Sequence, residues 1–308
     1  MEFQSLDDAP RWFREALSVP HDTDTVVVDG AAINYLTWGA VGSPGLIFVH
    51  GGGAHARWWT HVAAQFADRY RVAAIDLSGH GDSGHRASYS LEQWSGEVMA
   101  VAAAMGAAGA PVVIGHSMGG FVTIVTAALH GDDLAGVVVV DSPVNKPDPE
   151  VDAARAGQAF GKPRVYPDVA AALERFRTVP EQRNYEPYVM DHVARNSLRP
   201  VEATDDQPAG VVWKFDRNVF SAVVDHPRTA ARPHLAQVRT RLALLASQFG
   251  LVTPEVGRYM YDQLGRVAPV IELPQAGHHP MLDVPLVLLT AIRTLLADWE
   301  HSVPFTRD

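Results

Sequence analysis

The sequence contains no cysteine and is short of basic residues, with 25 lysines and arginines against 35 aspartates and glutamates in 308 residues. A chain without cysteine can form no disulfide, no thiolate nucleophile and no thiolate metal site, and this composition fits a reducing compartment. The formal net charge of −10 leaves no basic surface to neutralise a nucleic-acid backbone or an anionic bilayer. We therefore expect neither nucleic acid nor a membrane among its partners.

Targeting segments and metal-binding motifs are missing as well. The first twenty residues lack the long apolar run of a signal peptide or membrane span, because Glu2, Asp7 and Arg14 interrupt them, so we expect a cytoplasmic protein. The 14 histidines are dispersed, and even His50 and His55, five residues apart, do not have the spacing of metal ligands. The sequence therefore predicts no metal and no cofactor.

Short apolar runs alternate with amphipathic or alanine-rich stretches along most of the chain, and 47% of its residues are hydrophobic. The first two runs meet at Asp29-Gly30, a dipeptide suited to a tight hairpin turn. Strands are predicted at residues 25–28, 31–38, 46–49, 72–75, 112–114, 137–140, 242–246 and 267–271, and helices at 57–68, 90–107, 118–130, from about 254, and 284–300. Apolar runs of this kind are typical of strands covered on both faces, so we predict an α/β fold with a mostly parallel, eight-stranded sheet flanked by helices.

The alternation stops between Ser142 and Pro233, where repeated prolines break the chain into short helices and turns. This segment has the composition of an insertion into the sheet-forming part. We predict a core of residues 1–142 and 235–308, interrupted by an inserted unit at 143–234.

The sharpest local motif is Gly115-His116-Ser117-Met118-Gly119, between a predicted buried strand and a predicted helix. This Gly-x-Ser-x-Gly pattern is that of a nucleophile elbow, where small neighbours are needed because the serine occupies a strained backbone conformation. The turn also places Ser117 at a helix N-terminus, where the amide of Met118 can face developing negative charge. We predict Ser117 as a nucleophile.

A second motif, His50-Gly51-Gly52-Gly53, follows the predicted strand at 46–49. Bare glycine backbone can approach an oxyanion closely. A phosphate-binding loop is the rival interpretation, but neither a Gly-Lys-Ser/Thr ending nor Gly-x-Gly-x-x-Gly spacing is present. With its serine elbow, the chain resembles the α/β-hydrolase family, in its serine-nucleophile, esterase-like branch with a helical cap. The resemblance implies a second oxyanion amide at Gly52, with Gly53 as the alternative.

The segment Ala276-Gly277-His278-His279, after the last predicted strand, is similar to the catalytic-histidine loop of that family. The matching position is His278, and an imidazole there can accept the serine proton and return it to the leaving group. His279 is its neighbour near the pocket and the alternative base.

The acid of the triad departs from the commonest family pattern. Most members carry it in the loop after the strand that is predicted here at 242–246, but that loop has Gly250 at the expected position and no carboxylate nearby. Some members place it at the end of the preceding core strand, which here ends in Asp141. The resemblance therefore implies Asp141 as the acid that orients His278. The alternative is that Asp141 only ends or caps the strand.

The resemblance also implies that the insertion at 143–234 forms a helical cap over the site. Candidate substrate-binding residues are the mostly apolar side chains of Trp58, Phe249, Leu251, Tyr188, Phe220 and His279. They favour a moderately hydrophobic substrate.

Together these features predict a serine hydrolase that cleaves a small to medium carboxylic ester through an acyl-enzyme. Lactones, thioesters, amides and carbon–carbon bonds stay open as substrates, because their cleavage also passes through an oxyanion. The serine argues against the dehalogenase and epoxide hydrolase branches, which use aspartate. A non-catalytic receptor or ligand-binding protein on this fold is the alternative of a different class. The sequence indicates no oligomeric state.

Overall fold

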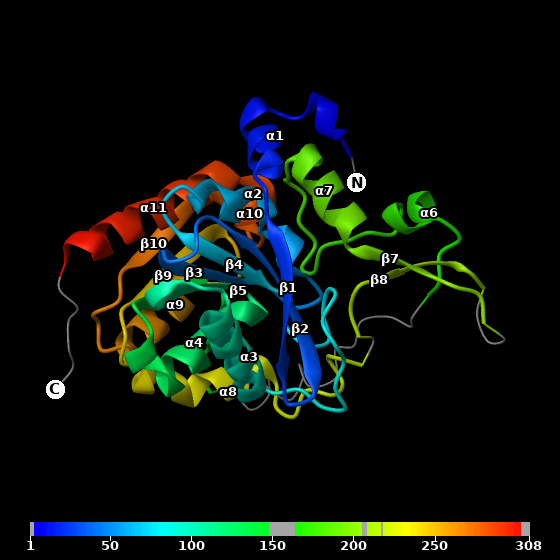
Figure 1. Cartoon of the computed structure of the whole chain (residues 1–308). Helices are drawn as coiled ribbons and strands as arrows, with labels where there is room; N and C mark the ends of the chain where they lie inside the picture. Colours follow the sequence, from blue (N-terminus) through cyan, green and yellow to red (C-terminus); the bar gives the residue numbers. More distant parts are fainter. Residues whose placement is uncertain (1–2, 148–163, 205–207, 217, 303–308) are drawn as a thin grey trace.

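The fold is built on one eight-stranded sheet, which we describe from a computed structural model for residues 3–147, 164–204, 208–216 and 218–302. The strand order is β1-β2-β4-β3-β5-β6-β9-β10 (Figure 1). Their bounds are Asp22–Val28 (β1), Ala31–Trp38 (β2), Pro44–Val49 (β3), Arg71–Ile75 (β4), Ala108–His116 (β5), Gly136–Val140 (β6), Leu242–Phe249 (β9) and Val270–Gly277 (β10). β2 pairs antiparallel with β1 and β4, and the other pairs are parallel. The predicted mostly parallel, eight-stranded α/β sheet is confirmed.

Helices cover both faces of the sheet. Successive side chains of a strand point to opposite faces, so a strand with apolar residues at successive positions needs helices on both sides to bury them. On β3, Leu46 and Phe48 join one apolar cluster while Ile47 and Val49 join the other. The first cluster includes residues of α1 (Arg11–Ser18), α2 (Thr60–Ala63) and α11 (Pro285–His301). The second includes residues of α3 (Leu91–Ala104), α4 (Met118–Leu129), α8 (Pro227–Ala231) and α9 (Pro254–Gln263). Figure 1 shows these two layers on opposite sides of the strands.

Two predicted elements differ in the structure. The helix predicted at 57–68 is divided into a 3₁₀ turn at Ala56–Trp58, the short α2 and a second 3₁₀ turn at Ala64–Phe66. Tight 3₁₀ turns are frequent in short connecting segments, and here they allow most of the segment to be buried. The last strand begins at Val270 and not at 267, because Pro269 cannot donate to a ladder and Val267 is 50% exposed.

The inserted segment contains more than helices. Alongside α6 (Val169–Leu173) and α7 (Pro187–Asn196) it forms an antiparallel hairpin of β7 (Leu198–Val201) and β8 (Gly210–Trp213), which the sequence did not predict. A proline, Pro200, is tolerated because a two-stranded ribbon consists of edge strands. α8, within the predicted insertion, contacts α3 and α4 and so packs with the core layer. Division of the chain at 143 and 234 stays a prediction, and residues 148–163 lie outside the described residues.

Among the described residues, no helix is both long enough and apolar enough to cross a membrane.

Buried histidines are a notable part of the interior. Six of them are at most 6% exposed and have a pKa that burial lowers from its ordinary value, to about 4 for His50 and about 3 for His61 and His116. The pKa values of His55, His80 and His279 are also lowered, with burial as the largest cause. These imidazoles are therefore neutral in the folded protein at neutral pH.

We predict that the melting temperature falls as the pH drops from about 7 to 5. A histidine whose pKa is lowered by folding takes up a proton on unfolding below about pH 6.5, at a slope of roughly 1.4 kcal/mol per pH unit per proton. Burial raises the pKa of Asp76, of Glu97 and, to about 6, of Asp283, which opposes this trend, but the six histidines outnumber these three carboxyl groups. Thermal unfolding followed across this pH range tests the prediction. His61→Gln should flatten the slope, and a pH-independent melting temperature would contradict the account.

Candidate active site

The elbow at Ser117 joins β5 to α4 in a backbone conformation that side-chain-bearing residues rarely adopt, with φ 53° and ψ −118°. A Cβ on Gly115 would collide with the carbonyl of Gly119, and a Cβ on Gly119 would collide with the carbonyl of His50. A Cβ on Gly120 would overlap the Ser142 hydroxyl. Small residues around Ser117 are thus required by space as well as by the strained turn.

Ser117, His278 and Asp141 are connected by hydrogen bonds. His278 Nε2 lies 3.0 Å from the Ser117 hydroxyl, and His278 Nδ1 lies 2.7 Å from Asp141 Oδ2. With its Nδ1–H donating to the carboxylate, the imidazole has Nε2 free to accept the serine proton. The three residues stand at or just after the carboxyl ends of β5, β6 and β10, which parallel pairing brings to one edge of the sheet.

Asp141 is fully buried and is held by the loop that follows β9. Its carboxylate accepts the backbone N–H groups of Leu251 (2.8 Å), Val252 (3.1 Å) and Ser247 (3.3 Å). A Cβ on Gly250 would overlap this carboxylate. Gly250, at the position where the family pattern led us to expect a carboxylate, therefore leaves room for the Asp141 side chain from the end of β6.

The predicted oxyanion groups lie beside Ser117. A Cβ on Gly51 would stand 3.3 Å from Ser117 Cβ, and one on Gly52 would stand 3.6 Å from Met118 Sδ. Met118 begins α4, so its amide belongs to the helix N-terminus, where backbone donors have no partner within the helix. Gly53, the alternative, has φ +70° in the same turn.

Four of the six predicted substrate-binding residues lie close to the hydrogen-bonded trio or to the glycine turn. Trp58 and His279 are packed together beside His278, with ring centroids 5.5 Å apart and the His279 ring 4.6 Å from that of His278. Phe220 lies against Gly52, since a Cβ there would be 3.0 Å from its ring. Leu251 contacts Asp141 through its backbone N–H, which donates to the carboxylate.

Tyr188 and Phe249 are placed differently. The Tyr188 ring packs edge-on against that of Phe13 of α1, with ring centroids 4.9 Å apart, in the contact between α7 and α1, and its role in substrate binding stays a prediction. A buried aromatic in the insertion gives no local sign of which element it will meet. Phe249 is 63% exposed at the end of β9, so its role in substrate binding stays a prediction.

Side chains that sequence reasoning missed hold the backbone around His278. His116 Nε2 lies 2.7 Å from the His278 carbonyl, and burial lowers the pKa of His116 to about 3, so a neutral ring can donate this bond. Gln182 Oε1 accepts the His279 N–H at 2.8 Å, and Asp283 Oδ2 accepts the Gly277 N–H at 2.6 Å. Only His116 carried a sequence signal, as the residue preceding the serine in the elbow.

Ring nitrogens of His116, His278 and His279 lie within 4.8 Å of one another and form a group that could hold a metal ion. Sequence spacing could not show this group, because its members come from two separate loops. His116 Nε2 and both ring nitrogens of His278 are already hydrogen-bonded within the protein. Coordination of an ion there would have to replace some of these bonds.

Residues 46–291 match the profile of the alpha/beta hydrolase family, and the chain belongs to this family. It is 38% identical over 116 residues to esterase Rv0045c of Mycobacterium tuberculosis, covering 37% of this chain and 38% of that protein. It is 31% identical over 112 residues to a pimeloyl-[acyl-carrier protein] methyl ester esterase of Edwardsiella ictaluri, covering 36% and 41%. The matches thus span about two fifths of these relatives.

A solved E-2-(acetamidomethylene)succinate hydrolase has the same fold, with a TM-score of 0.75 at 19% identity over 90% of this chain and all of that one. The chain is therefore a hydrolase-family protein with esterase relatives.

We predict that Gly250→Ala lowers both activity and stability, because the new methyl group meets the Asp141 carboxylate. Overpacking costs about 1–3 kcal/mol, and a displacement near 1 Å at a reacting group costs about a hundredfold in rate. Ester hydrolysis and thermal melting measure the two effects.

Gly257→Ala is the matched control, because its Cβ would make only ordinary contacts, at 3.6 Å with Val252 and 3.9 Å with Val270, within helix α9. It should be neutral or slightly stabilising. Equal behaviour of the two variants would show that Gly250 is not needed to accommodate Asp141.

Proposed function

We propose that the chain is a serine hydrolase that cleaves a small to medium carboxylic ester through an acyl-enzyme. The observation that carries this proposal is the continuous hydrogen-bonded chain from buried Asp141 through His278 to Ser117, on an elbow with φ 53°. The esterase relatives support the same chemistry. A chain without cysteine fits a reducing compartment, so the proposal includes a cytoplasmic location.

In the first half-reaction, Ser117 Oγ attacks the ester carbonyl carbon while its proton passes to His278 Nε2. Asp141 keeps the imidazole in the required tautomer and stabilises the imidazolium ion. The carbonyl oxygen, now negative, is stabilised by the amides of Met118 and Gly52, with Gly53 as the alternative donor. Collapse of this intermediate breaks the bond to the alcohol, which leaves with the proton of His278.

In the second half-reaction, water replaces the alcohol. His278 accepts a proton from water as its oxygen attacks the acyl carbon, and a second tetrahedral oxyanion forms in the same place. Its collapse returns the proton to Ser117 and releases the carboxylic acid. The two half-reactions together convert the ester and one water molecule into an alcohol and a carboxylic acid, and they leave Ser117 and His278 as they began.

The walls of the site favour a moderately hydrophobic substrate. Phe220 lies against Gly52, and the thioether of Met118 approaches the same glycine. Trp58, 6% exposed, packs against His279 beside the base. An acyl or alcohol group of modest size could gain affinity from these apolar surfaces.

We predict that the protein hydrolyses short- and medium-chain p-nitrophenyl esters and is labelled by a fluorophosphonate probe. Ser117→Ala should abolish labelling and hydrolysis. Asp141→Asn should lower kcat by about 10³–10⁴-fold, because the imidazole loses the partner that fixes its tautomer. Steady-state kinetics and probe labelling measure both.

His278→Ala should be inactive, whereas the control His301→Ala, at an exposed histidine in the last turn of α11, should keep wild-type rates. If the wild-type protein neither turns over an ester nor reacts with the probe, the proposed hydrolase is wrong and the non-catalytic ligand-binding protein takes its place.

A further inference from the structure

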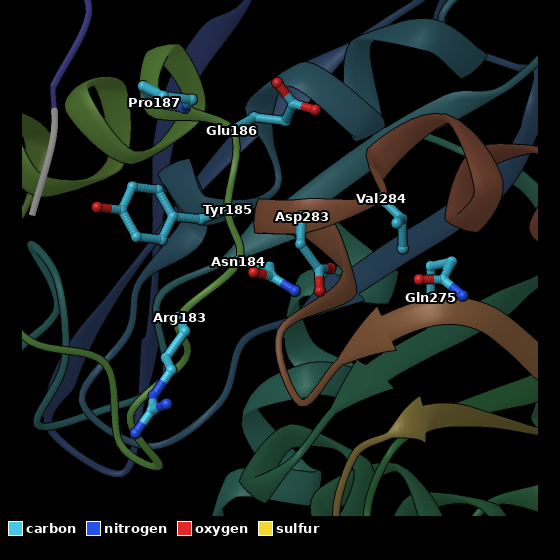
Figure 2. Close-up of a pocket in the computed structure, with 8 residues that line it drawn as sticks. All are labelled: Arg183, Asn184, Tyr185, Glu186, Pro187, Gln275, Asp283 and Val284. Carbon is cyan, nitrogen blue, oxygen red and sulfur yellow. The ribbon is translucent and has the colours of Figure 1, made fainter.

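Part of the inserted segment runs directly along the loop that carries His278. We call residues 178–187 the cap strap and residues 277–283 the histidine loop. The strap donates the Glu186 N–H to the Leu282 carbonyl at 2.7 Å. In Figure 2 strap residues pass the turn that carries Asp283, with Arg183 and Tyr185 pointing away from it. A pocket of about 410 Å³ is lined by strap residues 183–187 and by Gln275, Asp283 and Val284.

Gln182 makes the closest side-chain connection between the strap and the base. Its side chain is 7% exposed, and its Oε1 accepts the His279 N–H at 2.8 Å. Its Nε2 donates to the Asn184 carbonyl at 3.1 Å and, more weakly, to the His279 carbonyl at 3.4 Å. Its own backbone N–H is bound by the Thr178 hydroxyl at 3.0 Å. One amide side chain thus pairs with both polar backbone groups of the residue after the base.

The backbone on the other side of His278 is also held. Asp283 accepts the Gly277 N–H at 2.6 Å, and a Cβ on Gly277 would stand 2.8 Å from Gln182 Cδ and 3.1 Å from Asp283 Oδ2. Gly277 is therefore enclosed between the two side chains. Since His116 engages the His278 carbonyl and Gln182 the His279 N–H, both polar groups of the peptide that follows His278 are bound by side chains.

We propose that Gln182 is a positioning residue through which the cap fixes the catalytic histidine, an inference that rests on the proposed function. The base stands 3.0 Å from Ser117, and its rate contribution depends on that distance. A movement of the His279 backbone would displace the attached His278 ring. The cap strap therefore lies beside the pocket and also fixes the position of the His278 ring relative to Ser117.

The chemistry of an amide explains why glutamine suits this position. Its acceptor meets an N–H group and its donor meets two carbonyls. Glutamate would keep the first bond but would set an oxygen against the carbonyls and a negative charge near His278. Methionine has a similar volume but would leave a buried N–H group without an acceptor.

The test compares Gln182→Met with Gln275→Met, an exposed glutamine in the lining of the pocket beside the strap. Gln182→Met should lower kcat and the fluorophosphonate labelling rate by about ten- to a hundredfold with little change in KM, because the base and not substrate binding is affected. Gln275→Met should match the wild type. A folded Gln182→Met protein with kcat within twofold of wild type, or with only KM raised, would overturn the proposal.

Gln182→Glu gives a second readout if the methionine variant fails to fold. The added carboxylate should favour the imidazolium form, so the acidic limb of the kcat/KM profile moves to higher pH than in the wild type. An unshifted limb counts against Gln182 lying close enough to influence His278.

Hydrogen–deuterium exchange separates this inference from the proposed function, because it does not require activity. Exchange in a peptide covering 277–283 should accelerate in Gln182→Met, which removes the acceptor of the His279 N–H, and stay unchanged in Gln275→Met. If the wild type is inactive but exchange accelerates, the proposed function fails and the contact stands as a structural clamp. If the wild type is active and exchange is unchanged, the positioning role fails alone.

Discussion

The buried carboxylate of Asp141 is the group on which the site depends. A fully buried charge is costly unless it is paired and hydrogen-bonded, and Asp141 accepts three backbone N–H groups in addition to the His278 ring. The same bonds shape the loop after β9, whose Gly250 leaves space for them. One side chain at the end of β6 therefore holds both a loop more than a hundred residues later and the His278 ring.

The parallel sheet supplies the rest of the geometry. β5, β6 and β10 end at the same edge, so residues distant in sequence meet there without any local signal between them. α4 begins at the serine and directs its N-terminal amides to the place where an oxyanion would form. Packing of α4 against the sheet makes this arrangement rigid, since ten of its twelve residues are buried. The strained elbow is thus stabilised by the core around it.

The sequence predicted features that depend on local patterning. Apolar runs such as residues 46–49 identified the sheet, and the glycines around Ser117 identified the elbow. Local patterning alone did not identify Asp141. Its predicted role was inferred from the family resemblance and from the lack of a carboxylate at the expected position after residues 242–246. The packing of Tyr188 on α1 could not be predicted, since nothing in a short window states which distant element a buried aromatic will contact. Gln182 was missed for the same reason: it is 97 residues from His279.

The central claim is that Asp141 is the hydrogen-bond partner of His278, and proton NMR of the imidazole tests it most directly. A hydrogen bond of Nδ1–H to a buried carboxylate should give a resonance far downfield of the amide region, identified by its loss in His278→Ala. The account predicts this resonance in the wild type and in Ser117→Ala, and its loss or a large upfield shift in Asp141→Asn. An unchanged resonance in Asp141→Asn would contradict the account, because His278 would then be held by another group.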